Sequence, residues 1–208
     1  IKIKMLNLFL LGFSAGLPLS LTGTTLQAWC TVSGVSILTI GIFSLVGQPY
    51  IYKFLWAPLM DRFTLPFFGR RRGWMLLTQI LLFFSIFSFA FLNPAKNPFL
   101  VAAIALIIAF LSASQDIAVD AYRTEILKPK DRGMGAAWFV NGYRLAILVS
   151  GGLAFILADH FGWKITYLLM GFLMGVGIFA TCFSKEPQMP LYIPMSFRES
   201  ISGPFKQL

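Results

Sequence analysis

The chain has 208 residues, of which 57% are hydrophobic and only 12% are charged. A soluble domain carries about 25% charged residues, so this composition, with a mean hydropathy of +0.76, indicates a membrane protein with several spans. The formal net charge is +9. The basic residues cluster between apolar blocks and leave no soluble basic face, which excludes a nucleic-acid partner.

Six apolar stretches are long enough to cross a membrane as helices, which requires about 20 residues each. The stretches are continuously apolar and do not alternate in polarity, which excludes the strands of a membrane barrel. We therefore predict an all-α, polytopic membrane protein with one six-helix transmembrane bundle over residues 1–183. The expected spans are residues 5–30, 37–60, 74–93, 98–126, 134–158 and 164–183.

The connections between these spans differ in charge on the two sides of the membrane. One set holds a single lysine, whereas the other set and the chain ends hold most of the basic residues. Because basic loops stay in the cytoplasm, we expect both ends of this chain there. Residues 184–208, with four prolines, are expected to form a cytoplasmic linker. The missing initial Met and the lack of a terminal helix lead us to expect a piece of a longer protein.

Enzymatic and metal chemistry find no support in the sequence. The single histidine, His160, lies in a short expected loop, and Cys30 and Cys182 lie near span ends at opposite membrane faces. A disulfide needs closely spaced cysteines, so none is expected. The sequence holds no metal-ligand spacing, nucleophile motif or phosphate-binding loop. We expect no cofactor, no metal and no direct use of ATP.

Two carboxylates, Asp116 and Asp120, lie one helical turn apart within the expected span 98–126. A carboxylate at the centre of a spanning helix costs about 2.5–3.5 kcal/mol on insertion scales. A sequence carries this cost where the charge faces a watery path or a charged partner. At 100° per residue, both carboxylates share a face with Ser112 and Arg123. This polar face predicts a transporter, with Asp116 first and Asp120 second as candidate proton-coupling residues.

The depth of other charges suggests partners for these carboxylates. Arg144 enters the fifth expected span to about the depth of Asp116, and Lys53 lies at about the depth of Asp120. We therefore expect Asp116 to pair with Arg144, and Asp120 to pair with Lys53 or Arg123. Arg144 can instead bind a substrate carboxylate, because its planar fork suits that group. A static ion-pair network that only holds helices together remains the alternative.

Uncharged polar side chains in the spans are candidates for cargo binding. The first span is rich in hydroxyl groups and contains Gln27, which we predict to bind the substrate. Its Gly12 and Gly16 allow close approach of another helix. Alternatively, the hydroxyl groups of the first span only form hydrogen bonds to the carbonyls of their own helix. The remaining candidates for contact with substrate or with an ion pair are Gln48, Gln115 and Asn141.

A charged loop follows the second expected span. Residues 57–62 read APLMDR and residues 69–73 read GRRRG. This pattern resembles the G-x-L-x-D-R-x-G-R-K/R loop between helices 2 and 3 of major facilitator transporters. Ala57 replaces the first glycine, and a longer spacer separates the two parts. An acidic residue beside several arginines can form a gating latch, whereas arginines alone can simply set topology. The gating candidates are Asp61, Arg62, Gly69, Arg70, Arg71 and Arg72.

Further segments resemble the AmpG-type muropeptide permeases of the same superfamily. The matching residues are 12–19 (GFSAGLPL), 26–29, 44–48, 53–62, 66–74, 112–117, 142–145 and 149–152. The resemblance implies a proton-driven importer of anhydro-muropeptides (GlcNAc-anhydroMurNAc peptides) in the bacterial inner membrane, used in peptidoglycan recycling. It also implies two six-helix halves, of which this chain is the first and needs the second. Its partners are then the muropeptide, protons and membrane lipid.

Two alternatives to this function stay open at the level of the sequence. One is a related facilitator with another cargo, such as an acyl-CoA. The other is a membrane receptor or assembly subunit in which the buried charges pair helices and move nothing. Gradient-dependent uptake of the cargo distinguishes transport from the latter role.

Overall fold

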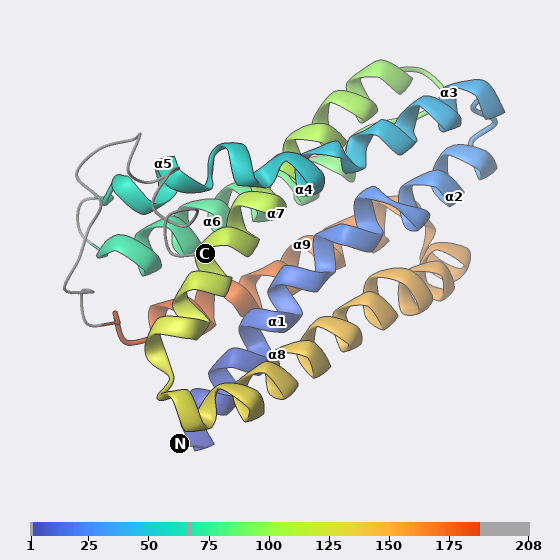
Figure 1. The fold of residues 1–208 in the computed structure, drawn as a ribbon. Helices are drawn as coiled ribbons and strands as arrows, with labels where there is room; N and C mark the ends of the chain where they lie inside the picture. The colour runs from blue at the N-terminus through green and yellow to red at the C-terminus, as the bar shows by residue number, and fades with distance from the viewer. Residues whose placement is uncertain (1, 66–67, 188–208) are drawn as a thin grey trace.

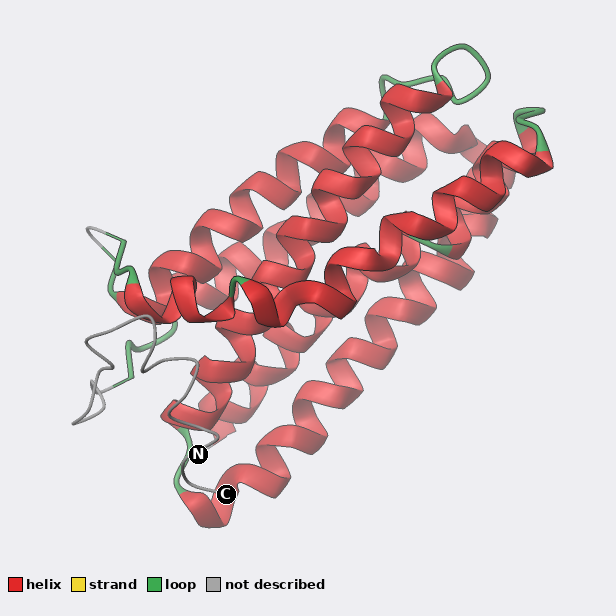
Figure 2. Ribbon diagram, turned by 45° about the horizontal axis from the view of Figure 1, so that its top comes forward, coloured by secondary structure: helices red, strands yellow, loops and turns green. Residues whose placement is uncertain are grey.

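The computed structural model describes residues 2–65 and 68–187, and it confirms the all-α prediction. Within these residues the regular elements are all helical, as Figure 2 shows, and the only β-type contact is an isolated bridge between Leu65 and Gly69. In a membrane, helices satisfy every backbone hydrogen bond within the segment, which is why long apolar stretches adopt them. The expected linker 184–208 lies outside the described residues beyond position 187.

The helices lie side by side in one bundle (Figure 1). The α-helices are α1 (Lys2–Thr22), α2 (Thr24–Val32), α3 (Ile37–Phe43), α4 (Gln48–Tyr52), α5 (Ala57–Arg62), α6 (Arg70–Phe89), α7 (Pro98–Ile126), α8 (Arg132–Ile147) and α9 (Ala154–Cys182). Short 3-10 segments are η1 (Ser44–Gly47), η2 (Lys53–Leu55) and η3 (Pro129–Asp131), and η4 (Leu148–Leu153) is a π-helix.

Four continuous helical stretches are long and apolar enough to cross a membrane, against six expected spans. The difference has two structural causes. The last stretch, Pro129–Cys182, contains the fifth and sixth expected spans, which meet at Gly162, a residue with a positive φ of 81°. The second expected span does not count as one helix, because it is divided into α3, η1, α4, η2 and α5.

Prolines explain where the second span is divided. Pro49 occupies the first turn of α4 and Pro58 the first turn of α5. Proline has no N–H group and is favoured where the helix ladder starts, although Pro18 lies inside α1. Pro49 and Pro58 therefore each begin a new helical piece, and short 3-10 turns connect the pieces. One such boundary lies at Gln48, where η1 ends and α4 begins.

Helix α1 forms the centre of the bundle and packs against α8 at very short distance. A Cβ atom placed on Gly12 would overlap the carbonyl oxygen of Phe139, and one placed on Gly142 would overlap that of Phe9. Gly16 faces the Tyr143 backbone in the same way. The expected small-residue face of α1 is therefore present, and its partner is α8.

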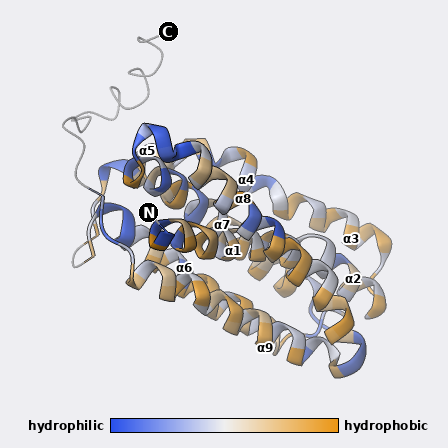
Figure 3. Ribbon diagram, turned by 90° about the horizontal axis from the view of Figure 1, so that it is seen from below, coloured by the Kyte–Doolittle hydropathy of each residue, from blue (hydrophilic) through white to orange (hydrophobic). Residues whose placement is uncertain are grey.

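Hydrophilic residues gather at one end of the bundle. Figure 3 shows this colouring around the N-terminus and α5, whereas the long helices are mainly hydrophobic. The start of α6, with Arg70 and Arg71, belongs to the same end. The bundle therefore has an apolar body, a charged end, and a few polar groups within the body.

Candidate functional site

An ion pair joins η2 to α7 inside the apolar body. Lys53 Nζ lies 3.7 Å from Asp116 Oδ2, and the two side chains are 35% and 15% exposed. A direct N–H···O hydrogen bond spans about 2.7–3.2 Å, so this contact is an ion pair without a direct bond. The site that Lys53 and Asp116 form is open on one side of the bundle, and we call it the Asp116 site.

One expected charge pair is present and the other is not. Asp120 pairs with Arg123 at 3.1 Å on its own helix, as expected, whereas Asp116 pairs with Lys53 in place of Arg144. Lys53–Leu55 is a 3-10 turn, which rises about 2.0 Å per residue where an α-helix rises about 1.5 Å. Over three residues this adds only about 1.5 Å, so the long, flexible lysine side chain supplies most of the reach to Asp116.

Helix α8 supplies a second polar face next to the Asp116 site. Tyr143 lies within electrostatic range of the Asp116 and Asp120 carboxylates. Asn141 and Arg144 are exposed, and Arg144 forms no ion pair with a described residue. Arg123 of α7 stacks over the Phe139 ring at 4.8 Å, which ties this part of α8 to α7. An exposed arginine in a spanning helix has the charge and the donors to bind an anionic group.

The three glutamine candidates have different surroundings. Gln27 on α2 and Gln48 at the start of α4 are half-buried. Gln115 is fully buried and donates a 2.9 Å hydrogen bond to Ser14 Oγ of α1. One residue along a helix turns the side chain by 100°, so Gln115 points into the helix core while Asp116 does not. Gln115 therefore lies apart from the Asp116 site.

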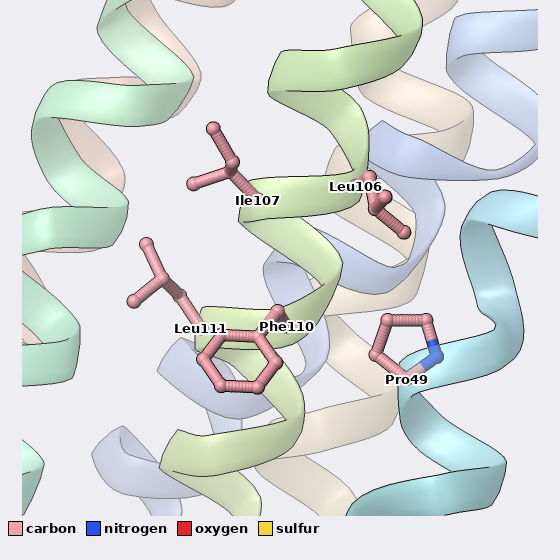
Figure 4. A pocket seen from close by; sticks show the side chains of 5 residues that line it. All are labelled: Pro49, Leu106, Ile107, Phe110 and Leu111. Atoms are coloured by element: carbon pink, nitrogen blue, oxygen red, sulfur yellow. The ribbon is translucent and has the colours of Figure 1, made fainter.

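Figure 4 shows an apolar recess between α4 and α7, beside the polar face of α7. Its volume is about 420 Å³, and its lining residues are Pro49, Leu106, Ile107, Phe110 and Leu111. None of these side chains carries a polar group, so this recess does not offer hydrogen bonds to a polar cargo. The side chains of α4 and α7 therefore leave unfilled space between the two helices near Pro49.

At the charged end, Arg70 and Arg71 of α6 share the Glu125 carboxylate of α7. Arg70 Nη2 donates to Glu125 Oε1 at 3.0 Å, and Arg71 binds the same oxygen and also Asp61 of α5. The Arg71 side chain is only 8% exposed. We call Asp61, Arg70, Arg71 and Glu125 the arginine cluster; it connects three helices.

The start of α6 is fastened to the end of α9 as well. Glu186 accepts hydrogen bonds from the backbone N–H groups of Arg71 at 2.9 Å and Arg72 at 3.1 Å. Arg72 donates to the carbonyls of Thr181 and Cys182 in the last turn of α9. These contacts place a carboxylate at a helix N-terminus and a cation at a helix C-terminus, as the helix dipoles favour.

The structure brings most of the gating candidates together and adds two residues that the sequence interpretation missed. Gly69 has a φ of 84°, and the Glu186 side chain stands where its Cβ would lie. Arg62 is exposed and forms no ion pair with a described residue. The missed residues are Glu125 and Glu186. Buried arginines require carboxylate partners. The run of arginines in the sequence was therefore the signal that could have led to Glu125 and Glu186.

A bundle of long apolar helices with an ion pair in its body and a charge cluster at one end defines an integral membrane protein of the transporter type. The sequence matches the Major Facilitator Superfamily over residues 6–198. The chain therefore belongs to this superfamily.

Curated relatives agree with this assignment. The chain is 52% identical over 200 residues to the anhydromuropeptide permease of Escherichia coli strain K12. The aligned region covers 96% of this chain and 41% of that protein. The permease of Escherichia coli O157:H7 gives the same values. A Haemophilus influenzae protein is 44% identical over 189 residues, or 90% of this chain and 44% of its own length. The chain thus spans less than half the length of these relatives.

Proposed function

We propose that this chain is the N-terminal half of a secondary transporter that imports anhydro-muropeptides, driven by the proton gradient, for peptidoglycan recycling. The superfamily assignment supports transport, and the 52% identity to a protein named anhydromuropeptide permease supports the cargo. The Escherichia coli permease is more than twice as long as the segment that matches this chain. We expect a second half of corresponding length to complete the cargo cavity. The bacterial inner membrane is the proposed location, with both ends of this chain in the cytoplasm.

The observation that carries proton coupling is the ion pair between Lys53 and Asp116 in the apolar body. An intramembrane carboxylate with a cation at 3.7 Å has two alternative states: charged and paired, or protonated and released from the pair. Opening and closing of a cavity changes the solvation of both groups and so changes which state is favoured. Asp120, whose side chain is 50% exposed and paired with Arg123, acts as the second acid of this path.

The polar face of α8 is the proposed contact for the peptide part of the cargo. Arg144 is exposed in a spanning helix and forms no ion pair with a described residue, so its guanidinium can bind a cargo carboxylate. Asn141 lies one turn before it on the same face and supplies an amide for peptide groups. Gln27 and Gln48 extend the polar surface toward the sugar hydroxyls.

The arginine cluster is the proposed cytoplasmic gate. Its ion pairs connect α5, α6 and α7, so these helices separate only when the cluster opens. Alternating access requires a contact that is made in one conformer and broken in another. The geometry suits this role, since Arg71 bridges two carboxylates from different helices.

An uptake assay tests the proposed function. Vesicles that contain the complete transporter are supplied with labelled anhydro-muropeptide, with and without a proton gradient. Asp116→Asn should abolish gradient-driven uptake while membrane insertion stays intact. Asp159→Asn, which changes an 87% exposed loop carboxylate, is the matched control and should leave uptake unchanged. Absence of gradient-dependent uptake in the unaltered protein would refute the proposal, and full uptake by Asp116→Asn would refute the coupling role.

A further inference from the structure

Two buried hydroxyl groups next to the Asp116 site have no hydrogen-bond partner among the described residues. They are Tyr50 Oη of α4 and Ser112 Oγ of α7. Ser112 is fully buried. Buried polar atoms are nearly always paired, with protein groups or with ordered water. Tyr50 Oη lies near the hydroxyls of Ser112 and Thr22, but none of these contacts has the geometry of a hydrogen bond for Tyr50 Oη or Ser112 Oγ. A molecule that bonds to both Tyr50 and Ser112 satisfies the two atoms.

Ser112 differs from Ser114 and Ser150, two other buried serines in the spanning helices. Ser114 donates to the carbonyl of Phe110 at 2.8 Å, and Ser150 donates to the carbonyl of Ala146 at 2.7 Å. Such bonds to the preceding turn are the usual way in which a helix satisfies a serine. The Ser112 hydroxyl makes no such bond, so it is free to bind a group outside its own helix.

The two hydroxyls face the charges of the same site. Ser112 precedes Asp116 by one turn on the same face of α7, and Tyr50 lies beside Ser112 and within electrostatic range of Asp116. Lys53, one turn after Tyr50, stands 3.7 Å from the Asp116 carboxylate, too far for a direct hydrogen bond. A water molecule beside the pair can bind both groups at this separation.

The bonding capacities of these four groups complement one small hydroxylic molecule. Tyr50 and Ser112 can each donate or accept, Asp116 only accepts when ionised, and Lys53 only donates. A buried water makes two to four hydrogen bonds of both kinds, typically about three. A hydroxyl of a sugar cargo has the same chemistry, with one donor and two lone pairs.

We propose that Tyr50, Ser112, Lys53 and Asp116 form a binding site for an ordered water molecule that connects α4, η2 and α7. The site satisfies the two orphan hydroxyls and bridges the ion pair. In the proton-coupling role, which rests on the proposed function, a hydronium ion at this position passes its proton to an Asp116 oxygen and leaves a neutral water. Asp116 is then uncharged, and Lys53 has lost its counter-ion.

Infrared difference spectroscopy on the complete transporter in lipid bilayers tests the site without any assay of transport. The protein is switched between neutral and acidic buffer in ordinary water and in water labelled with oxygen-18. A bound water that bridges the charges should give an O–H stretching band that shifts with the label. Absence of a label-sensitive band in the unaltered protein overturns the proposal and needs no variant that could misfold.

Substitutions then locate the water. Tyr50→Phe combined with Ser112→Ala should abolish the label-sensitive band, whereas Tyr52→Phe, which removes a half-exposed hydroxyl from the same short helix, should retain it. A band that persists in the double variant overturns the assignment to these residues. Circular dichroism checks that each variant keeps its helices, and the single variant Tyr50→Phe, which preserves ring packing, should weaken the band even if the double variant is unstable.

A cargo arm separates the two sources of the hydroxyl group. In the absence of muropeptide, a label-sensitive band that depends on Tyr50 supports water. If no such band exists, but Tyr50→Phe weakens muropeptide binding severalfold, then the site takes a cargo hydroxyl and the water assignment is overturned. The spectral result is independent of uptake, so failure of the proposed transport function and failure of this site are distinguishable.

Discussion

Thr25 Oγ1 of α2 donates a 2.6 Å hydrogen bond to the carbonyl oxygen of Ser150 in the π-helix η4. This bond joins two places where a spanning helix departs from the regular ladder: the break between α1 and α2 at Gly23, and the π-helix itself. π-helical turns often occur at functional sites. The two irregular segments are thereby held together at one level of the bundle.

Removing this bond should destabilise the bundle by about 1 kcal/mol, the typical net value of one buried hydrogen bond. Thr25→Val keeps the shape of the side chain and deletes the donor, so the Ser150 carbonyl loses its partner. The midpoint of thermal unfolding in detergent measures the effect. Thr24→Val, at the exposed neighbouring position, should leave the midpoint unchanged, and equal effects of the two substitutions would contradict the role of the bond.

The contact between α1 and α8 should not tolerate a single added methyl group. Gly12→Ala places a Cβ onto the Phe139 carbonyl oxygen, so the helices must separate. Overpacking of this kind costs about 1–3 kcal/mol or more. We expect a large loss of folded protein in a thermal-stability assay with size-exclusion detection. Gly41→Ala, where no atom lies within 4 Å of the new Cβ, is the control and should have wild-type stability.

Charge neutralisation at Arg71 should open the arginine cluster. Arg71→Gln leaves Glu125, with a side-chain exposure of 21%, short of a partner, while Asp61 at 47% is largely solvated. Breaking a buried pair costs about 3–5 kcal/mol, and we expect a smaller loss here because Arg70 still pairs with Glu125 and Asp61 is half-exposed. Thermal stability measures the loss.

Two further variants test whether the loss comes from the charge pair. Adding Glu125→Gln to Arg71→Gln should cost less than the sum of the two single changes, because both remove the same ion pair, although Arg70 then loses its carboxylate as well. Arg62→Gln changes an exposed arginine that forms no ion pair with a described residue and should be silent. Strict additivity of the Arg71 and Glu125 substitutions would show that the two side chains are not coupled.

The Glu186 carboxylate should stabilise the start of α6 in a salt-dependent way. It receives the N–H groups of Arg71 and Arg72 at the positive end of the helix, an interaction of about 0.3–1 kcal/mol at low ionic strength. Glu186→Gln should therefore lower the thermal midpoint in low salt, with a smaller difference in high salt because of screening. Lys185→Gln, at the exposed neighbouring position, serves as control, and a salt-independent loss would point to packing instead of charge.

Hydropathy and charge patterns alone were sufficient for the all-α fold, the span 98–126 and the general position of the arginine-rich loop. The helix α7 occupies Pro98–Ile126 as expected, because a long apolar stretch in a membrane must satisfy its backbone hydrogen bonds within one helix. The motif GRRRG likewise indicated where the arginines would gather, since arginines at a helix start require carboxylate partners nearby.

The pairing of the charges depended on tertiary structure. Lys53 pairs with Asp116 and not with Asp120, a choice that depends on how the divided second span packs against α7 and on the reach of the lysine side chain. Gln115 and Asp116 are neighbours in sequence but point to different surroundings, and only helix packing decides which faces the core. Glu186 joins Arg71 across 115 positions of chain. Local composition determines which segments are helices, whereas the depth and rotation of each helix depend on its neighbours, and these decide which charges meet.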